Sequence, residues 1–156
     1  MPDGDTTRLI VWSSEIRQVH ARLRQALAVT RTEVADGLDD AELGRDMLVF
    51  CHGFCTALDG HHHGESSTLF PAIAAAHPEL RPTLHKLEQD HSMIGHLLAG
   101  LRAAADRGST AEELDRHLDG IAATMENHFR YEERALLRVL ETLDLPADPA
   151  VVLGPL

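Results

Sequence analysis

The chain has 156 residues, of which 44% are hydrophobic and only 4% are aromatic. A chain of this length forms one domain with a single core, and its apolar residues are mostly Ala, Leu and Val, which favours helices over strands. The formal charge is −11, with 14 Lys and Arg against 25 Asp and Glu. This charge argues against a nucleic-acid or anionic-membrane surface, so we expect neither kind of partner.

The sequence carries no export or membrane signal, because no basic segment precedes an apolar stretch at the N-terminus and no apolar run is long enough to cross a bilayer. We therefore expect a cytoplasmic protein. Cys51 and Cys55 are four residues apart on a predicted helix and so share a face. We interpret them as small core residues beside Phe54, with a redox or soft-metal role as the alternative.

Residues 1–12 are predicted to form an N-terminal arm in which Leu9, Ile10, Val11 and Trp12 pack across the fold. A helix then follows over residues 13–36, with Ser13 or Ser14 as its N-cap and Gly37 as its stop signal. The inward positions of this helix alternate in steps of four and three residues, as expected for one buried stripe. They are Ile16, His20, Leu23, Leu27, Thr30 and Val34.

A second helix is predicted over residues 40–70, weakening around Leu69-Phe70-Pro71 because proline disrupts helical hydrogen bonding. Its inward residues are Leu43, Met47, Phe50, Phe54, Ala57 or Leu58, His61 and Glu65.

The third helix spans about 79–106 and the fourth 110–143, where Ser109-x-x-Glu112 is predicted to be a capping box; a tail covers 144–156. Four helices with short connections predict an all-α, antiparallel up-down-up-down bundle with an N-terminal arm, as one domain over residues 1–156. The inward positions of the last two helices are Leu80, Leu84, Leu87, His91, Ile94, Leu98, Leu101 and Ala105, then Leu114, Ile121, Met125, His128, Glu132, Ala135 and Val139.

Each of the four predicted helices carries a histidine in its inward stripe: His20, His61, His91 and His128. Counted at roughly 1.5 Å of rise per residue, all four lie at matching distances from the connecting turns. The four imidazoles therefore converge on one layer of the bundle.

Two of these histidines are followed by an inward carboxylate one turn later, in His61-x-x-x-Glu65 and His128-x-x-x-Glu132. Residues four apart lie on one helix face, and burial of six such groups at one level is costly without a positive partner. A pair of metal ions is the simplest one. Imidazole and carboxylate without thiolate favour iron or manganese over structural zinc.

At these positions the chain resembles the hemerythrin-like family, also called the His-His-Glu cation-binding domain. The resembling stretches are Val19–Leu23, His61–Glu65 with Leu69-Phe70-Pro71, Asp90–Ile94, and His128–Glu133. The resemblance implies a four-helix bundle around a non-haem di-iron centre. It implies that His20 and His61 bind one iron, that His91 and His128 bind the other, and that Glu65 and Glu132 bridge them. We expect two iron ions, oxo- or hydroxo-bridged.

One position departs from the family pattern. Oxygen-carrying hemerythrins have a second histidine one turn after the first on the third helix, where this chain has Gly95, and His96 falls on another face. His62 or Tyr131 could replace the missing ligand, or the coordination position could stay open. An open position favours reaction with peroxide or dioxygen over reversible oxygen carriage.

The remaining histidines are interpreted as structural or solvated. His117 is expected to flank the core and His52 to be peripheral. Glu133 is about 140° from His128 on a helical wheel, so it is expected to lie at the surface or to support a ligand. His63, His85 and His96 are expected on outward faces and His77 in a turn.

The favoured function is reaction of a di-iron centre with peroxide or dioxygen, with catalase-like peroxide decomposition preferred and Tyr131 as the candidate catalytic residue. Its partner would be a small molecule. The alternative is non-enzymatic binding or sensing of dioxygen, nitric oxide or iron. A metal-stabilised bundle without redox chemistry is a third reading, and the sequence leaves the oligomeric state open.

Overall fold

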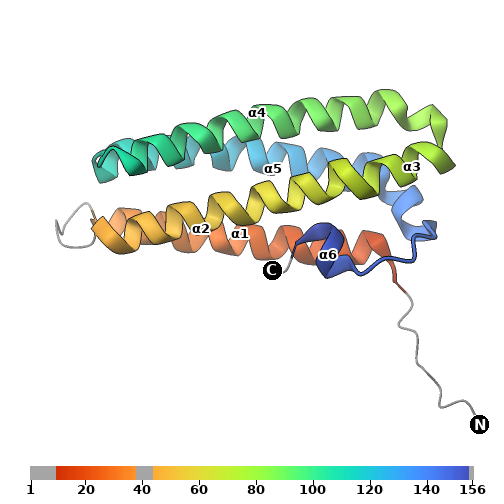
Figure 1. Ribbon diagram of the computed structural model, residues 1–156, viewed down its shortest axis with the longest axis horizontal. Coiled ribbons are helices and arrows are strands. Elements are labelled where there is room, and N and C mark those ends of the chain that lie inside the picture. Colours follow the sequence, from red (N-terminus) through yellow and green to blue (C-terminus); the bar gives the residue numbers. More distant parts are fainter. Residues whose placement is uncertain (1–9, 38–43, 155–156) are drawn as a thin grey trace, which may run out of the picture.

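The computed structural model describes residues 10–37 and 44–154, and within these ranges the chain is almost entirely helical and contains no strand. Four long helices make up the body of the molecule (Figure 1). They are α1 (Trp12–Gly37), α2 (Gly44–Gly64), α4 (Arg81–Asp106) and α5 (Ala111–Thr142). The predicted all-α fold is confirmed.

The long helices form a four-membered ring, because α1 and α4 each pack against both α2 and α5. In Figure 1 the sequence colours run in opposite directions along consecutive long helices. The core lies between them and is built mainly from Leu, Ile and Phe side chains. Among the described residues, no helix is both long enough and apolar enough to cross a lipid bilayer.

Helix α1 begins one residue earlier than predicted. The carbonyl of Val11 already accepts hydrogen bonds from the backbone N–H groups of Ser14 at 3.0 Å and Glu15 at 3.1 Å, so Ser13 and Ser14 lie inside the helix and the predicted serine cap is wrong. Trp12, expected in the arm, is the first helical residue and is fully buried. Residues 1–9 of the arm lie outside the described residues. All six predicted inward positions of α1 are buried.

The second predicted helix continues to Ala76 instead of ending at residue 70. It consists of α2, a π-helical turn η2 (Glu65–Leu69) and the short helix α3 (Phe70–Ala76). The N–H of Phe70 bonds to the carbonyl of Glu65, five residues back. Pro71 follows, which has no N–H and whose ring would crowd the carbonyl four residues earlier. The widened turn accommodates this proline without ending the helix. Three features of this predicted helix lie outside the residues that the structure describes: its start at residue 40, Leu43 and the side chain of Met47.

A 3₁₀ turn η3 (Pro78–Leu80) leads into α4. The N-cap of α5 is Thr110, whose hydroxyl accepts a hydrogen bond from Glu113 N–H at 3.2 Å, so the predicted capping box at Ser109 is wrong by one residue. Ser109 instead closes the end of α4, since its N–H bonds to the carbonyl of Ala104. Beyond Glu132 the fully buried positions of α5 are Leu136 and Leu140, whereas the predicted Ala135 and Val139 are half-buried.

The C-terminal segment, expected to be an irregular tail, contains the short helix α6 (Pro149–Leu153). The carboxylate of Asp148 accepts a hydrogen bond from Ala150 N–H and caps this helix. Val152 and Leu153 are buried, and α6 packs against α1, α2 and η2. Figure 1 shows α6 lying across α1 and α2. The segment therefore completes the core beside the last turn of α2.

Cys51 and Cys55 are both fully buried free thiols, and burial raises their pKa to about 11 and about 12. Because only the thiolate is nucleophilic, we expect both residues to react with a thiol reagent at pH 8 at least about 100-fold more slowly in the native protein than in denaturant. Labelling followed by absorbance tests this. Rapid labelling of the native protein would contradict the interpretation of both cysteines as core residues.

Candidate metal centre

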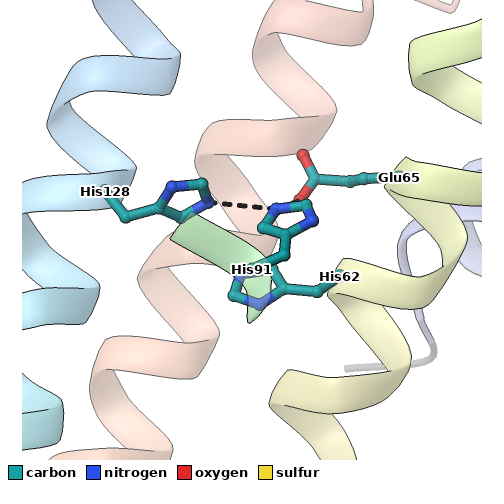
Figure 2. A group of neighbouring side chains, drawn as sticks. All are labelled: His62, Glu65, His91 and His128. Atoms are coloured by element: carbon teal, nitrogen blue, oxygen red, sulfur yellow. Dashed lines mark hydrogen bonds and ion pairs between the residues drawn. The ribbon is translucent and has the colours of Figure 1, made fainter. Parts of the chain in front are cut away.

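The seven predicted ligand residues lie together in the middle of the bundle. Two groups of side chains each place their donor atoms within 4.8 Å of one another, and Glu65 belongs to both groups. Figure 2 shows the first group, with His62 and Glu65 facing His91 and His128. The groups are His62, Glu65, His91 and His128, and His20, His61, Glu65 and Glu132.

Each buried carboxylate contacts one imidazole on its own helical segment and one on another helix. Along the chain, Nε2 of His61 lies 3.1 Å from Oε1 of Glu65, and Nε2 of His128 lies 3.3 Å from Oε2 of Glu132. Between helices, Nε2 of His91 lies 3.4 Å from Glu65 Oε1, and Nε2 of His20 lies 3.5 Å from Glu132 Oε1. The spacing of four residues therefore places each pair on one inward face, as its periodicity predicts.

The imidazoles also stand close to one another. Nε2 of His91 and Nε2 of His128 are 3.1 Å apart (dashed line in Figure 2). The ring of His62 stacks on that of His91, with centroids 3.9 Å apart and planes inclined by 12°. His20 stacks on Phe129 at 3.8 Å. The inward-facing nitrogens thus share a small volume.

The outer nitrogen, Nδ1, of each of the four inward histidines faces a polar group outside the cluster. For His61 the group is the Leu153 carbonyl at 2.9 Å, and for His91 it is the Ser66 hydroxyl at 2.9 Å. For His128 it is the Asp90 carboxylate at 3.1 Å. For His20 it is Glu133 Oε1 at 3.4 Å. Such partners hold Nδ1–H outward and leave the Nε2 lone pair for a metal.

Most of the inner atoms of the cluster have no hydrogen-bond partner among the described residues, although they are buried. They are Nε2 of His20, His61 and His62, and both carboxylate oxygens of Glu65 and Glu132. Orphaned buried polar atoms are rare in folded proteins because each costs desolvation free energy. A set made only of nitrogen and carboxylate oxygen donors fits iron or manganese ions.

The electrostatics of the cluster favour an ionised Glu65. Burial raises the pKa of Glu65, but charge and hydrogen bonding from His61, together with the other neighbouring side chains, hold its pKa well below the usual range. Burial lowers the pKa of His20, yet Glu132 and Glu133 more than offset this and raise it to about 9. At neutral pH Glu65 is therefore ionised and His20 is protonated, and a bound cation would take the place of that proton as the positive partner of the carboxylates.

His62 differs from the other histidines of the cluster. Burial, followed by the nearby positive charge of His91, lowers the pKa of His62 well below its usual value. A neutral imidazole keeps a lone pair, which is the form that binds a metal. His62 is therefore suited to be a ligand by its protonation as well as by its position.

Tyr131 lies at the edge of the cluster. It is half-buried, and its ring packs against the Lys86 ammonium group, with Nζ 4.1 Å from the ring centroid. It lines a cavity of about 530 Å³ together with Lys86, Asp90 and His128. Lys86 Nζ in turn lies 3.4 Å from the Asp90 carboxylate that contacts His128. The cavity thus reaches one imidazole of the cluster from the protein surface.

The other histidines occupy the positions predicted for them. His63, His85 and His96 are exposed. His52 is peripheral, with Nε2 2.8 Å from Asp106 Oδ1, and the ring of His117 lies beside Gly100 on α4.

Sequence reasoning anticipated the supporting position of Glu133 but missed three groups behind the ligands. Ser66 and Asp90 are each adjacent in sequence to a ligand candidate, so polar neighbours of the motifs were a usable signal. The carbonyl of Leu153 had no such signal, because any residue has a carbonyl.

A comparison with family models agrees with the geometry. The family model of the hemerythrin HHE cation-binding domain matches residues 13–141. The chain therefore belongs to the hemerythrin HHE cation-binding family. No curated protein and no solved structure matches the chain.

A bound cation should stabilise the fold through the buried carboxylates. At a ferrous concentration about 100 times the dissociation constant, we expect the unfolding temperature to rise by about 5 to 10 °C. The rise in unfolding temperature should be much smaller in His61→Gln, which removes one buried donor. It should equal that of the parent protein in the control His63→Gln, whose side chain is exposed although it lies two residues before Glu65. Thermal unfolding followed by circular dichroism tests this. Equal stabilisation of the two variants would exclude His61 from the metal site.

Proposed function

We propose that this chain holds two iron ions in the buried cluster and that it reacts with peroxide or dioxygen, with decomposition of peroxide as the favoured reaction. The observation that carries the proposal is the pair of donor groups that share Glu65. Within them both carboxylates and the Nε2 atoms of His20, His61 and His62 are buried without hydrogen-bond partners. One ion in each group would satisfy these atoms and neutralise both carboxylates.

The two donor groups define the proposed ligand sets. His20, His61 and Glu132 would hold one iron, and His62, His91 and His128 the other, with Glu65 common to both. Glu132 Oε2 also lies 3.3 Å from His128 Nε2, so this carboxylate could contact both irons. Iron would supply the exchange of electrons with peroxide, which these side chains cannot supply themselves.

The protein's own residues orient the ligands and control access. Leu153, Ser66, Asp90 and Glu133 hold the outer nitrogens, so the imidazoles are fixed before a metal arrives. The cavity beside His128 gives a small molecule a path towards the cluster. Its polar lining suits a hydrogen-bonding substrate of the size of peroxide, and the Tyr131 hydroxyl would face that substrate.

We further propose that His62 replaces the histidine absent at Gly95. The His62 ring stacks on His91, and His62 belongs to the same donor group as His91 and His128. A Cβ atom placed at Gly95 would meet nothing within 4 Å among the described residues, so this position has room for a side chain. Of the three replacements considered from the sequence, the geometry therefore favours His62 over Tyr131 and over an open position.

His62→Gln tests this ligand assignment. We expect one of the two irons to bind at least about tenfold more weakly, while the ion at His20 and His61 is retained. Iron titration against a competing chelator measures both affinities, and His63→Gln is the neighbouring control. Introducing Gly95→His into the His62→Gln background should restore part of the lost affinity, because the position has room for a side chain. Two irons bound with unchanged affinity in His62→Gln would contradict the assignment.

The activity is tested by oxygen evolution from added peroxide. Iron-loaded protein should contain about two irons per chain and evolve oxygen, and Glu65→Ala and His91→Ala should each lower the rate by at least about 100-fold. Tyr131→Phe should keep the iron content and lower the rate by a smaller factor. The control is His63→Gln.

Two outcomes would contradict the proposal. A protein that evolves no oxygen but whose optical spectrum reverses on deoxygenation would be a dioxygen-binding protein, the alternative function. Fewer than two irons per chain in protein from its native host would exclude the di-iron centre itself.

A further inference from the structure

The C-terminal helix α6 forms a hydrogen bond with one histidine of the cluster. The Leu153 carbonyl oxygen lies 2.9 Å from Nδ1 of His61, and both groups are buried. A carbonyl oxygen accepts hydrogen bonds and never donates them, so Nδ1 of His61 must carry the proton. In the neutral ring the lone pair is then on Nε2, which lies 3.1 Å from Glu65 Oε1.

This contact depends on an unusually close approach of two backbones. A Cβ atom at Gly64, the last residue of α2, would lie 1.6 Å from the carbonyl oxygen of Val152. No residue larger than glycine fits there unless α6 moves away. Gly154, directly after α6, has a φ of 96°, and a Cβ there would lie 3.8 Å from the His61 backbone. Gly64 thus allows α6 to lie against the last turn of α2, and Gly154 allows the positive φ with which the chain leaves α6.

Other contacts hold α6 in this position. Val152 and Leu153 bury their side chains, leaving 4% and 0% of their surface exposed. Just before α6, the carbonyl of Leu145 accepts a hydrogen bond from the indole N–H of Trp12 at 3.3 Å. The segment is therefore anchored to α1 on one side and to α2 on the other.

His61 differs in this respect from the other three inward histidines. The outer nitrogens of His91, His128 and His20 face side chains of η2, α4 and α5, which belong to the body of the bundle. Only His61 among these four depends on the backbone of a short, separate helix that follows the bundle in sequence. A movement of α6 would release this imidazole and leave the other three held.

We propose that α6 is a positioning element for the metal centre, in which the Leu153 carbonyl fixes the ring of His61 so that Nε2 faces Glu65. The inference rests on the proposed di-iron function. Because the coupling between two binding events is reciprocal, metal bound at His61 should also hold α6 in place. The occupancy of the ion at His20 and His61 and the docking of α6 are then linked.

The experiment compares Gly64→Ala with Gly60→Ala. Both glycines lie in the last turns of α2, but a Cβ at Gly60 would meet nothing within 4 Å among the described residues. In the metal-free full chain, amide hydrogen exchange in residues 149–153 should become faster in Gly64→Ala and stay as in the parent protein in Gly60→Ala. The nitrogen-15 signals of the His61 ring are assigned by their loss in His61→Gln. In Gly64→Ala these signals should show that His61 no longer keeps the Nδ1–H form, whereas in Gly60→Ala His61 should keep it.

The same proteins are then titrated with ferrous iron. We expect Gly64→Ala to bind one of the two ions about 10- to 100-fold more weakly, the effect typical of losing a hydrogen-bond partner behind a histidine ligand. The ion at His91 and His128 should keep its affinity. In turn, saturating iron should slow exchange in α6 of the parent protein.

A second pair of variants covers the case in which Gly64→Ala fails to fold. Leu153→Ser places a hydroxyl at a fully buried position and should undock α6 without adding a strong metal ligand, and Val151→Ser is its control at a position that is 79% exposed. Faster exchange in α6 with both iron affinities unchanged would overturn the proposal. Unchanged exchange in both Gly64→Ala and Leu153→Ser would also overturn it.

The outcomes separate this inference from the proposed function. If the parent protein binds two irons and the α6 variants bind them equally well, the positioning role fails and the di-iron function stands. If the parent protein binds no iron, the di-iron function fails. In that case the nitrogen-15 spectra of the metal-free proteins still decide whether α6 orients the His61 ring.

Discussion

The structure depends on two glutamates, Glu65 and Glu132, that are fully buried where all four long helices meet. Burying a carboxylate without a partner is strongly unfavourable, and breaking a buried charge pair costs about 3–5 kcal/mol. Here every long helix brings at least one imidazole to the same level. The body of the bundle then consists of two apolar layers on either side of a charged layer, whose donor atoms could hold cations.

Burial alone would leave the imidazole rings free to rotate. Polar groups outside the cluster prevent this rotation. The four outer nitrogens face partners of three kinds: a hydroxyl, two carboxylates on different helices, and a backbone carbonyl. The geometry of the inner nitrogens is therefore set by residues that never face a metal. The π-helical turn η2 supplies both an inner and an outer group, because it presents Glu65 inward and Ser66 towards His91 within two consecutive residues.

Much of the fold and of the site follows from spacing. The inward stripes of α1 and α4, the positions of the four histidines and the two His-x-x-x-Glu pairs are periodic along single helices, and periodicity is visible in a sequence. The errors fall where local signals compete. Helix α1 begins at Trp12, ahead of the two serines, and Thr110 caps α5 beside an equally plausible Ser109. Pro71 follows a wider turn and does not end the helix.

The sequence by itself determined the all-α class, the family and the layer in which the histidines meet, because these depend on which residues recur at helical intervals. Only the tertiary structure decided that His62 joins His91 and His128, that Asp90 and Ser66 hold two of the rings, and that the C-terminal segment returns to His61. These contacts join residues on different elements, and the last of them uses a backbone carbonyl. Distances between elements depend on how the helices pack, which no spacing along one helix can specify.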